Sequence, residues 1–202
     1  MEEKYACLWS TKQQIESEYH DKEWGVPVSD DNLHFEMLTL EGAQSGLSWY
    51  TVLIKRENYK KAFCDFDPIK VSKFTQGKVE TLLEDKGIIR HKLKILSTIN
   101  NAKMIIKIQE EFGSFNKYIW SFVDFNPICN SWEKESDVPA STKLSDLIAK
   151  DLKKRGFKFL GTTTVYAYMQ AIGIVNDHVT SCFCYEKISK LQKDFKESFK
   201  NK

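Results

Sequence analysis

The sequence has no apolar run approaching the roughly 20 residues that a membrane-spanning helix needs, so we expect no membrane contact. Its first four residues are mostly charged, and no apolar segment follows them, so we also expect no signal peptide. Five cysteines, an odd number, argue against a disulfide framework. These absences predict a cytoplasmic protein whose thiols are reduced or bound to a metal.

Strand-like alternation, internal repeats and low-complexity segments are also scarce. The length of 202 residues fits one domain, and a formal charge of +2 permits a nucleic-acid partner only if basic residues gather locally. Helical periodicity dominates, which predicts an all-α protein. We expect one helical domain over residues 1–185, followed by a Lys-rich C-terminal tail over residues 186–202 that is either a weak amphipathic helix or frayed.

Among the helical patterns, residues 91–111 form the longest. Its apolar positions at i+3/i+4 spacing are Leu93, Leu96, Ile99, Ala102 and Ile106. Another helix is predicted over residues 50–63, and Ser141 is expected to cap the helix that carries Leu144, Leu147, Ile148 and Leu152. Residues 124–140 contain two prolines and a polar run, which predicts a surface loop.

Residues 40–49, LEGAQSGLSW, end a helix that Ser29, Asp30 or Asp31 would cap. Glu41 falls on or just past the buried stripe of that helix, and a buried carboxylate needs a partner. Small residues follow it, and Trp49 adds a large flat face. Such a set can form a slot for a planar, cationic ring. The alternative is an ordinary helix end with a core tryptophan.

Four residues have the composition of a structural zinc site. Cys7 and His20 lie near the start of the chain, whereas His178 and Cys182 have i, i+4 spacing near its end. Four protein ligands leave no open position for a catalytic water. The spacing is not that of a zinc finger, and the alternative is two buried cysteines with two ordinary histidines. Cys184 lies two residues beyond Cys182, and the spacing leaves open whether it competes with Cys182 for the metal.

A second pattern is a hairpin between two predicted helices, over residues 157–163. Gly161 leads into a helix whose free N–H groups can bind an anion, and four basic residues gather beside it: Lys153, Lys154, Arg155 and Lys158. The hairpin can clamp DNA phosphate; the alternative is a short connector with a solvated basic face. A third pattern, Trp9, Tyr19 and Trp24 together with Trp49, suits either a core or a ligand box.

Several long motifs resemble one family, the bacterial DNA-3-methyladenine glycosylases of type I. The similarity covers the chain from Cys7 to Tyr185. The motifs are YHDKEWGVP at 19–27, LEGAQSGLSW at 40–49, KRENY at 55–59, GIIRH at 87–91, KKRGFKF at 153–159 and VNDHV at 175–179.

The resemblance implies an all-α helix-hairpin-helix fold in which one structural zinc ion joins the two ends of the chain. Cys7, His20, His178 and Cys182 match the zinc ligands. Glu41 matches the carboxylate that reads the base. Tyr19 and Trp49 match the aromatic walls of the pocket, and Trp9 matches an aromatic near it.

The DNA-binding hairpin is matched by residues 157–163, with Lys158, Gly161, Thr162 and Thr163 as its contacts. The implied partner is alkylated double-stranded DNA, the implied state is a monomer, and the implied location is the bacterial cytoplasm, at the nucleoid when DNA is bound.

The implied activity is base-excision repair. The enzyme flips the nucleotide out of the helix and hydrolyses the N-glycosidic bond of 3-methyladenine. Methylation makes the base a cationic leaving group, so Glu41 acts by recognition and electrostatics, with activation of the attacking water as a second role. No amine nucleophile is needed, so no strand-cleaving lyase step is expected. Asp177 lies next to a zinc ligand and is interpreted as an orienting or structural residue.

Two rival hypotheses are a non-catalytic, zinc-stabilised helix-hairpin-helix DNA-binding module and a zinc hydrolase with an open coordination position. The sequence also departs from the family pattern. Glu16 stands where some members carry an aromatic, and Phe159 stands where the broader superfamily prefers glycine. The segment from Glu186 onward is longer than is usual.

Overall fold

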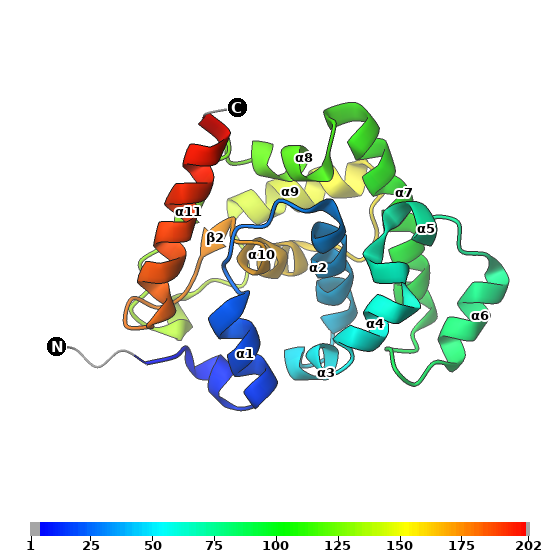
Figure 1. The fold of residues 1–202 in the computed structure, drawn as a ribbon, viewed down its shortest axis with the longest axis horizontal. Helices are drawn as coiled ribbons and strands as arrows, with labels where there is room; N and C mark the ends of the chain where they lie inside the picture. The colour runs from blue at the N-terminus through cyan, green and yellow to red at the C-terminus, as the bar shows by residue number, and fades with distance from the viewer. Residues whose placement is uncertain (1–4, 201–202) are drawn as a thin grey trace.

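The computed structural model describes residues 5–200, and its regular structure is mostly helical, as the periodicity predicts (Figure 1). With 3-10 helices written η, the elements are η1 (Leu8–Thr11), α1 (Gln14–Lys22), α2 (Asp31–Gln44), α3 (Trp49–Leu53), α4 (Arg56–Ala62), η2 (Cys64–Phe66), α5 (Pro68–Val71), α6 (Gln76–Glu84), α7 (Lys92–Phe112), α8 (Phe115–Ser121), β1 (Ile128–Cys129), η3 (Glu135–Asp137), α9 (Lys143–Lys154), α10 (Thr162–Ala171), β2 (Val175–Asn176) and α11 (Cys184–Lys200).

Two short segments lie outside the described residues. They are residues 1–4, on which the expectation of no signal peptide rests, and residues 201–202, which end the Lys-rich segment. Among the helices that are described, none is long and apolar enough to cross a membrane.

Helix α2 lies in the middle of the fold and is buried along most of its length (Figure 1). Asp30 caps it by accepting a hydrogen bond from the backbone N–H of Leu33 at 2.8 Å. The carboxylate of Asp31 accepts the first two backbone N–H groups of α8, at 2.9 and 2.8 Å. Two consecutive aspartates therefore bind the starts of two helices. Glu41, in the last turn of α2, is buried away from bulk water.

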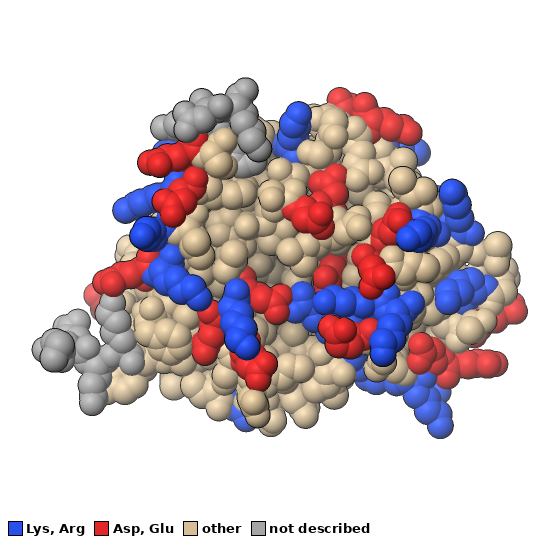
Figure 2. Space-filling view, in the orientation of Figure 1, with Lys and Arg blue, Asp and Glu red and all other residues tan. Residues whose placement is uncertain are grey.

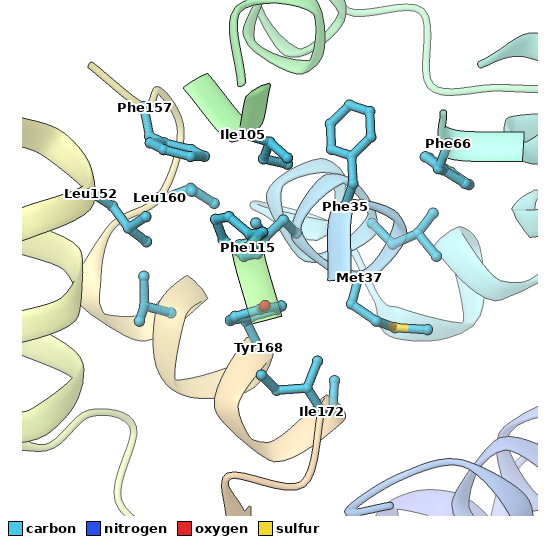
Figure 3. Close-up of a cluster of buried hydrophobic side chains, with 14 of the residues drawn as sticks. Phe35, Met37, Phe66, Ile105, Phe115, Leu152, Phe157, Leu160, Tyr168 and Ile172 are labelled. Atoms are coloured by element: carbon cyan, nitrogen blue, oxygen red, sulfur yellow. The ribbon is translucent and has the colours of Figure 1, made fainter. Parts of the chain in front are cut away.

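Side chains from α2, α7, α8, α9 and α10 meet in one hydrophobic core (Figure 3). Phe157 and Leu160 belong to the connection between α9 and α10, and both are buried in this core. The core thus anchors the hairpin from inside and leaves its tip at the surface. Deep in the same region, His34 bonds the Tyr168 hydroxyl at 2.7 Å and the Asn116 side chain at 3.1 Å. Burial lowers the pKa of His34 to about 4.

Three helical predictions need correction. The helix expected over residues 50–63 is two helices, because the chain changes direction at Lys55, which has a ψ of −4°. In α7, Leu93 and Leu96 are exposed, and the buried stripe begins at Ile95 instead; Ile99 and Ala102 are buried as predicted. Two neighbouring stripes share the same spacing, so periodicity alone could not choose between them.

Helix α9 also differs from the prediction in its cap and its buried face. Thr142, rather than Ser141, is its N-cap, because the Thr142 hydroxyl accepts from the backbone N–H of Ser145 at 3.2 Å. Leu147 faces solvent, whereas Ile148 and Leu152 are buried as expected.

The segment predicted as a surface loop, residues 124–140, contains η3 and strand β1. β1 pairs in parallel with β2, with Ile128 opposite Val175 and Cys129 opposite Asn176. A strand of two residues is too short to show a period, so the pattern gave no signal for it. The pairing places this segment beside residues 175–178, which include a predicted metal ligand.

The Lys-rich segment is helical to Lys200 as part of α11, which packs along one side of the fold (Figure 1). Ile188 is buried, and the ring centroid of Phe195 lies 4.4 Å from that of Trp120. The side-chain amide of Gln192 donates to the backbone oxygen of Gly173 at 3.0 Å. Helix α11 therefore runs through residue 185, where the composition changes, and contributes contacts to the body of the fold.

Candidate active site and metal centre

A cavity of about 360 Å³ opens between α1, the C-terminal end of α2, α3 and α10. That volume is in the range of small-molecule sites. Trp9, Tyr19, Glu41 and Trp49, the residues assigned to base recognition from the sequence, all line it. The structure thus brings together side chains from four separate elements, and their roles remain predictions.

Aromatic rings form one side of this cavity. The ring centroids of Tyr19 and Trp49 are 5.2 Å apart, and those of Trp9 and Tyr19 are 6.4 Å apart. The Tyr19 hydroxyl and the Trp49 indole N–H are buried and have no hydrogen-bond partner among the described residues. Buried polar atoms without partners are costly, and at a binding site a ligand or water supplies the partner. The cavity therefore offers flat faces and two unused polar atoms.

Glu41 is a buried acidic group that lines the cavity, with 6% of its surface exposed. It forms no hydrogen bond with any described residue. Burial raises the pKa of its carboxyl group from 4.5 to about 8. Tyr19 is buried too, and its burial, together with the nearby Glu41 carboxylate, raises the pKa of its hydroxyl group. The Tyr19 hydroxyl therefore keeps its proton. A cation entering the cavity would favour the ionised form of Glu41.

Beside the cavity, the four predicted metal ligands converge from the two ends of the chain. Cys7, His20, His178 and Cys182 are all buried, and one ligand atom of each lies within 4.8 Å of the others. The Sγ of Cys182 is 3.5 Å from both His20 Nε2 and His178 Nδ1, and the Sγ of Cys7 is 3.7 Å from His178 Nδ1. A zinc ion has bonds of about 2.3 Å to sulfur and about 2.05 Å to nitrogen. At tetrahedral angles, these bonds place a sulfur ligand and a nitrogen ligand about 3.6 Å apart. The residues therefore fit a tetrahedral ion.

Hydrogen bonds behind the cluster orient both imidazoles. His20 Nδ1 lies 2.7 Å from a carboxylate oxygen of Asp21, and His178 Nε2 lies 3.1 Å from the backbone oxygen of Trp24. Each ring nitrogen that faces away from the cluster donates to an acceptor, which leaves the lone pair of the other nitrogen for a metal. Donors around Cys182 lower the pKa of its thiol, which favours the thiolate that a metal requires.

Cys184 lies beside Cys182 but contacts the cluster from outside. The backbone N–H of Cys184 donates to the Cys182 sulfur at 3.4 Å, and its own thiol lies 4.0 Å from the backbone oxygen of His20. Cys184 groups with His20 and Asp21 but not with Cys7 or His178. Cys182 therefore completes the four-residue cluster, and the backbone N–H of Cys184 donates to its sulfur.

The hairpin between α9 and α10 projects from the core with an unusual backbone. Phe159 has a φ of 60°, in the left-handed region that glycine prefers, which accounts for the glycine expected there. Asn101 holds the neighbouring residue, because its side chain accepts from the Lys158 backbone N–H at 2.9 Å and donates to the Lys158 oxygen at 3.0 Å. Lys158, Gly161 and Thr163 are exposed, while Thr162 is half-buried.

One basic residue near the hairpin is already engaged. Arg155 donates to Asp151 at 2.8 Å and to Glu111 at 2.8 Å. Its ion pairs make it a poor phosphate ligand, so the basic group beside the hairpin reduces to three lysines. Figure 2 shows Lys and Arg interspersed with Asp and Glu over the described residues of one face, without a continuous basic surface.

Comparison with known proteins identifies the family. The sequence model of the methyladenine glycosylase family matches residues 9–185. The chain belongs to this family. It is 49% identical to DNA-3-methyladenine glycosylase 1 of Escherichia coli over 179 residues, which is 89% of this chain and 96% of the relative. It is 45% identical to DNA-3-methyladenine glycosylase of Haemophilus influenzae, over 88% of this chain and 96% of the relative.

Solved structures agree with the sequence comparisons. A crystal structure of 3-methyladenine DNA glycosylase I superposes with a TM-score of 0.87 at 49% identity, covering 90% of this chain and 100% of that one. The Staphylococcus aureus enzyme, whose structure concerns 3-methyladenine recognition, gives a TM-score of 0.86 at 37% identity, covering 89% and 95%. The family resemblance expected from the motifs is confirmed.

Within this methyladenine glycosylase, some cavity residues were not among the predicted ligands. Trp24 and Gln170 line the cavity, and so does Asp177. Trp24 lies in a motif that was noted, and its ring centroid is 5.1 Å from that of Trp9. Gln170 sits in α10 with no distinctive neighbours in the sequence, so no local signal could have marked it. All three belong to segments that only the fold brings to the cavity.

Another motif, KRENY, has a structural explanation. Arg56 donates from Nε to Glu36 at 2.6 Å and from Nη1 to Glu23 at 2.8 Å. These bonds join α4 to α2 and to the end of α1. Because α1 carries Tyr19 and His20, this ion cluster helps to hold the cavity wall and a predicted metal ligand in place.

Proposed function

We propose that this protein is a monofunctional DNA glycosylase that releases 3-methyladenine from alkylated double-stranded DNA. The observation that carries the proposal is the buried Glu41 carboxyl, which faces an aromatic cavity and has no hydrogen-bond partner among the described residues. Close relatives of this protein are named for this activity, and one structure of such an enzyme contains 3-methyladenine.

The cavity suits a flipped-out cationic base. The base stacks on Tyr19 and Trp49, and its exocyclic amine donates to Glu41. Trp9 closes the wall near the metal centre. Interactions that hold the departing base also stabilise the transition state, which lowers the barrier to attack of water at C1′. Glu41 acts in recognition and in electrostatic stabilisation, and it orients the attacking water as a second role.

The hairpin binds the DNA backbone. Exposed N–H groups at Gly161, Thr162 and Thr163 face phosphate at the start of α10, and Lys158 adds a positive charge. These contacts position the duplex without reading its sequence. The segment forms the helix-hairpin-helix motif in this proposal, because two helices flank a tip that is anchored in the core.

Cys7, His20, His178 and Cys182 would hold one zinc ion per chain. Four protein ligands make that ion structural: it would tie the two ends of the chain together and would supply no chemistry to the reaction. We further propose that the enzyme acts as a monomer in the bacterial cytoplasm, at the nucleoid when it binds DNA.

The lyase reaction is absent from this proposal because, among the described residues that line the cavity, none is a lysine. Without an amine nucleophile there is no covalent imine with the sugar. Borohydride trapping of the protein on methylated DNA is the corresponding measurement. A trapped covalent adduct would contradict the monofunctional mechanism.

The test of the activity is release of free bases from methylated duplex DNA, with wild type compared with Glu41→Gln. We expect the wild type to release 3-methyladenine, and we expect a sharp loss in the variant with its metal content unchanged. No release from a folded, metal-loaded wild type would favour the non-catalytic binding module. Retained DNA binding together with loss of activity on mild chelation would favour the zinc hydrolase.

A further inference from the structure

Asp177 has four hydrogen-bond donors around one carboxylate at the edge of the base cavity. Oδ1 accepts from Asn130 Nδ2 at 2.6 Å and from Trp132 Nε1 at 2.7 Å. Oδ2 accepts from the Tyr166 hydroxyl at 2.6 Å and from Gln170 Nε2 at 2.8 Å. An ionised carboxylate only accepts hydrogen bonds, so each of these four partners has to present a donor.

This requirement fixes the orientation of the Gln170 side chain. Its amide nitrogen must face Asp177, so its Oε1 must face the other way. Gln170 lines the base cavity with Glu41, and no described residue donates a hydrogen bond to its Oε1. The acceptors that line the cavity therefore include the Glu41 carboxylate and the amide oxygen of Gln170.

We propose that Gln170 determines specificity for a 6-amino purine, and that Asp177 is the positioning residue that holds its amide in the selective orientation. The proposal rests on the glycosylase function above. The exocyclic amine of adenine carries two N–H donors. Glu41 accepts one of them, and Gln170 Oε1 accepts the other.

The selected substrate class follows from the chemistry of the purine edge. 3-Methylguanine is also a cationic, N3-methylated base, so charge and stacking hardly separate it from 3-methyladenine. At position 6 it has an oxygen, which would face the acceptors of Glu41 and Gln170. A buried acceptor placed against another acceptor loses its hydrogen bond and is strongly disfavoured.

Asp177→Asn is a test that inverts this selection. The Trp132 indole is only a donor, so the new amide must keep its oxygen on that side and turn its NH₂ toward Tyr166 and Gln170. The Tyr166 hydroxyl can rotate to accept. Gln170 must flip to accept, and its own NH₂ then points into the cavity.

The experiment measures kcat/KM for release of 3-methyladenine and of 3-methylguanine from methylated duplex DNA. We expect the ratio of the two values to fall roughly 10- to 100-fold in Asp177→Asn. Tyr166→Phe is the matched control, because it removes a donor from the same carboxylate without requiring Gln170 to flip. Its ratio should equal that of the wild type. Metal content is measured for each variant because His178 is adjacent.

Gln170→Leu gives an independent test, because it removes the amide at similar size and leaves Asp177 in place. The ratio of kcat/KM for 3-methyladenine to that for 3-methylguanine should also fall in this variant, through loss of 3-methyladenine release. If Asp177→Asn fails to fold or to bind metal, the result for Gln170→Leu tests the proposal alone. An unchanged ratio in an active variant, with both rates reduced alike, would overturn the inference. A wild type that releases neither base would instead overturn the glycosylase function itself.

Discussion

The buried carboxyl of Glu41 predicts a pH dependence that runs opposite to acid catalysis. Burial raises its pKa from 4.5 to about 8, so burial costs the ionised form roughly 5 kcal/mol. Recognition of a cationic base requires that ionised form. In the free enzyme, about 1% of Glu41 is ionised at pH 6 and about half at pH 8.

The value of kcat/KM reports the ionisation state of the free enzyme. We therefore expect kcat/KM for release of 3-methyladenine to rise roughly 50-fold between pH 6 and pH 8, and then to level off. The assay is base release from methylated duplex DNA under single-turnover conditions, with spontaneous release subtracted at each pH.

Glu41→Gln is the control for this profile, because it has no carboxyl to ionise. Its residual activity should change little over the same range. A wild-type profile that is flat or falls from pH 6 to pH 8 would refute the reasoning. Such a result would mean that the neutral carboxyl is the form that binds, or that the cavity is wet enough for Glu41 to ionise normally.

Three further outcomes are expected from other buried groups. In the folded protein His34 stays neutral down to its pKa of about 4, whereas in the unfolded chain it takes up a proton near pH 6.5. The free energy of unfolding should therefore fall by roughly 3 kcal/mol as the pH drops from 6.5 to 4. An unchanged free energy in denaturant titrations at the two pH values would contradict this. Cys182→Ser should lose the metal and lower Tm by roughly 10 °C, while Cys64→Ser, outside the cluster, should keep both. Tyr19→Phe removes a hydroxyl that has no hydrogen-bond partner among the described residues, so it should leave the free energy of unfolding unchanged or raise it by about 1 kcal/mol. It should also weaken base binding about tenfold. Reduced stability of the variant would show that the hydroxyl has a partner.

The sequence allowed good prediction wherever a residue type and its spacing carry the chemistry. Glu41 was noticed because a carboxylate on a buried helical stripe is unusual, and the structure places it in the cavity. Spacing to histidines, together with the family resemblance, selected Cys7 and Cys182 from five cysteines, and both belong to the cluster. In each case the deciding property is local, or the motif itself is long enough to identify a relative.

Prediction failed where tertiary contacts decide between equal local choices. Leu93 and Ile95 lie on neighbouring stripes of α7 with the same period, and only the packing partners make one of them buried. Phe159 adopts a left-handed conformation because its neighbours are anchored in the core, not because its side chain favours it. The role of Gln170 depends on Asp177, seven residues away, whose four donors come from two separate segments, residues 130–132 and α10.

The cavity and the candidate metal centre are built from the same segments of the chain. Tyr19 and His20 are consecutive residues of α1, yet one lines the cavity and the other belongs to the metal cluster. The other half of the cluster comes from the segment after β2, which also carries Asp177 beside the cavity. A metal bound by the four clustered residues would therefore fix the distance between an aromatic wall and the group that orients Gln170. Loss of the metal should then weaken base recognition even though the metal touches no substrate.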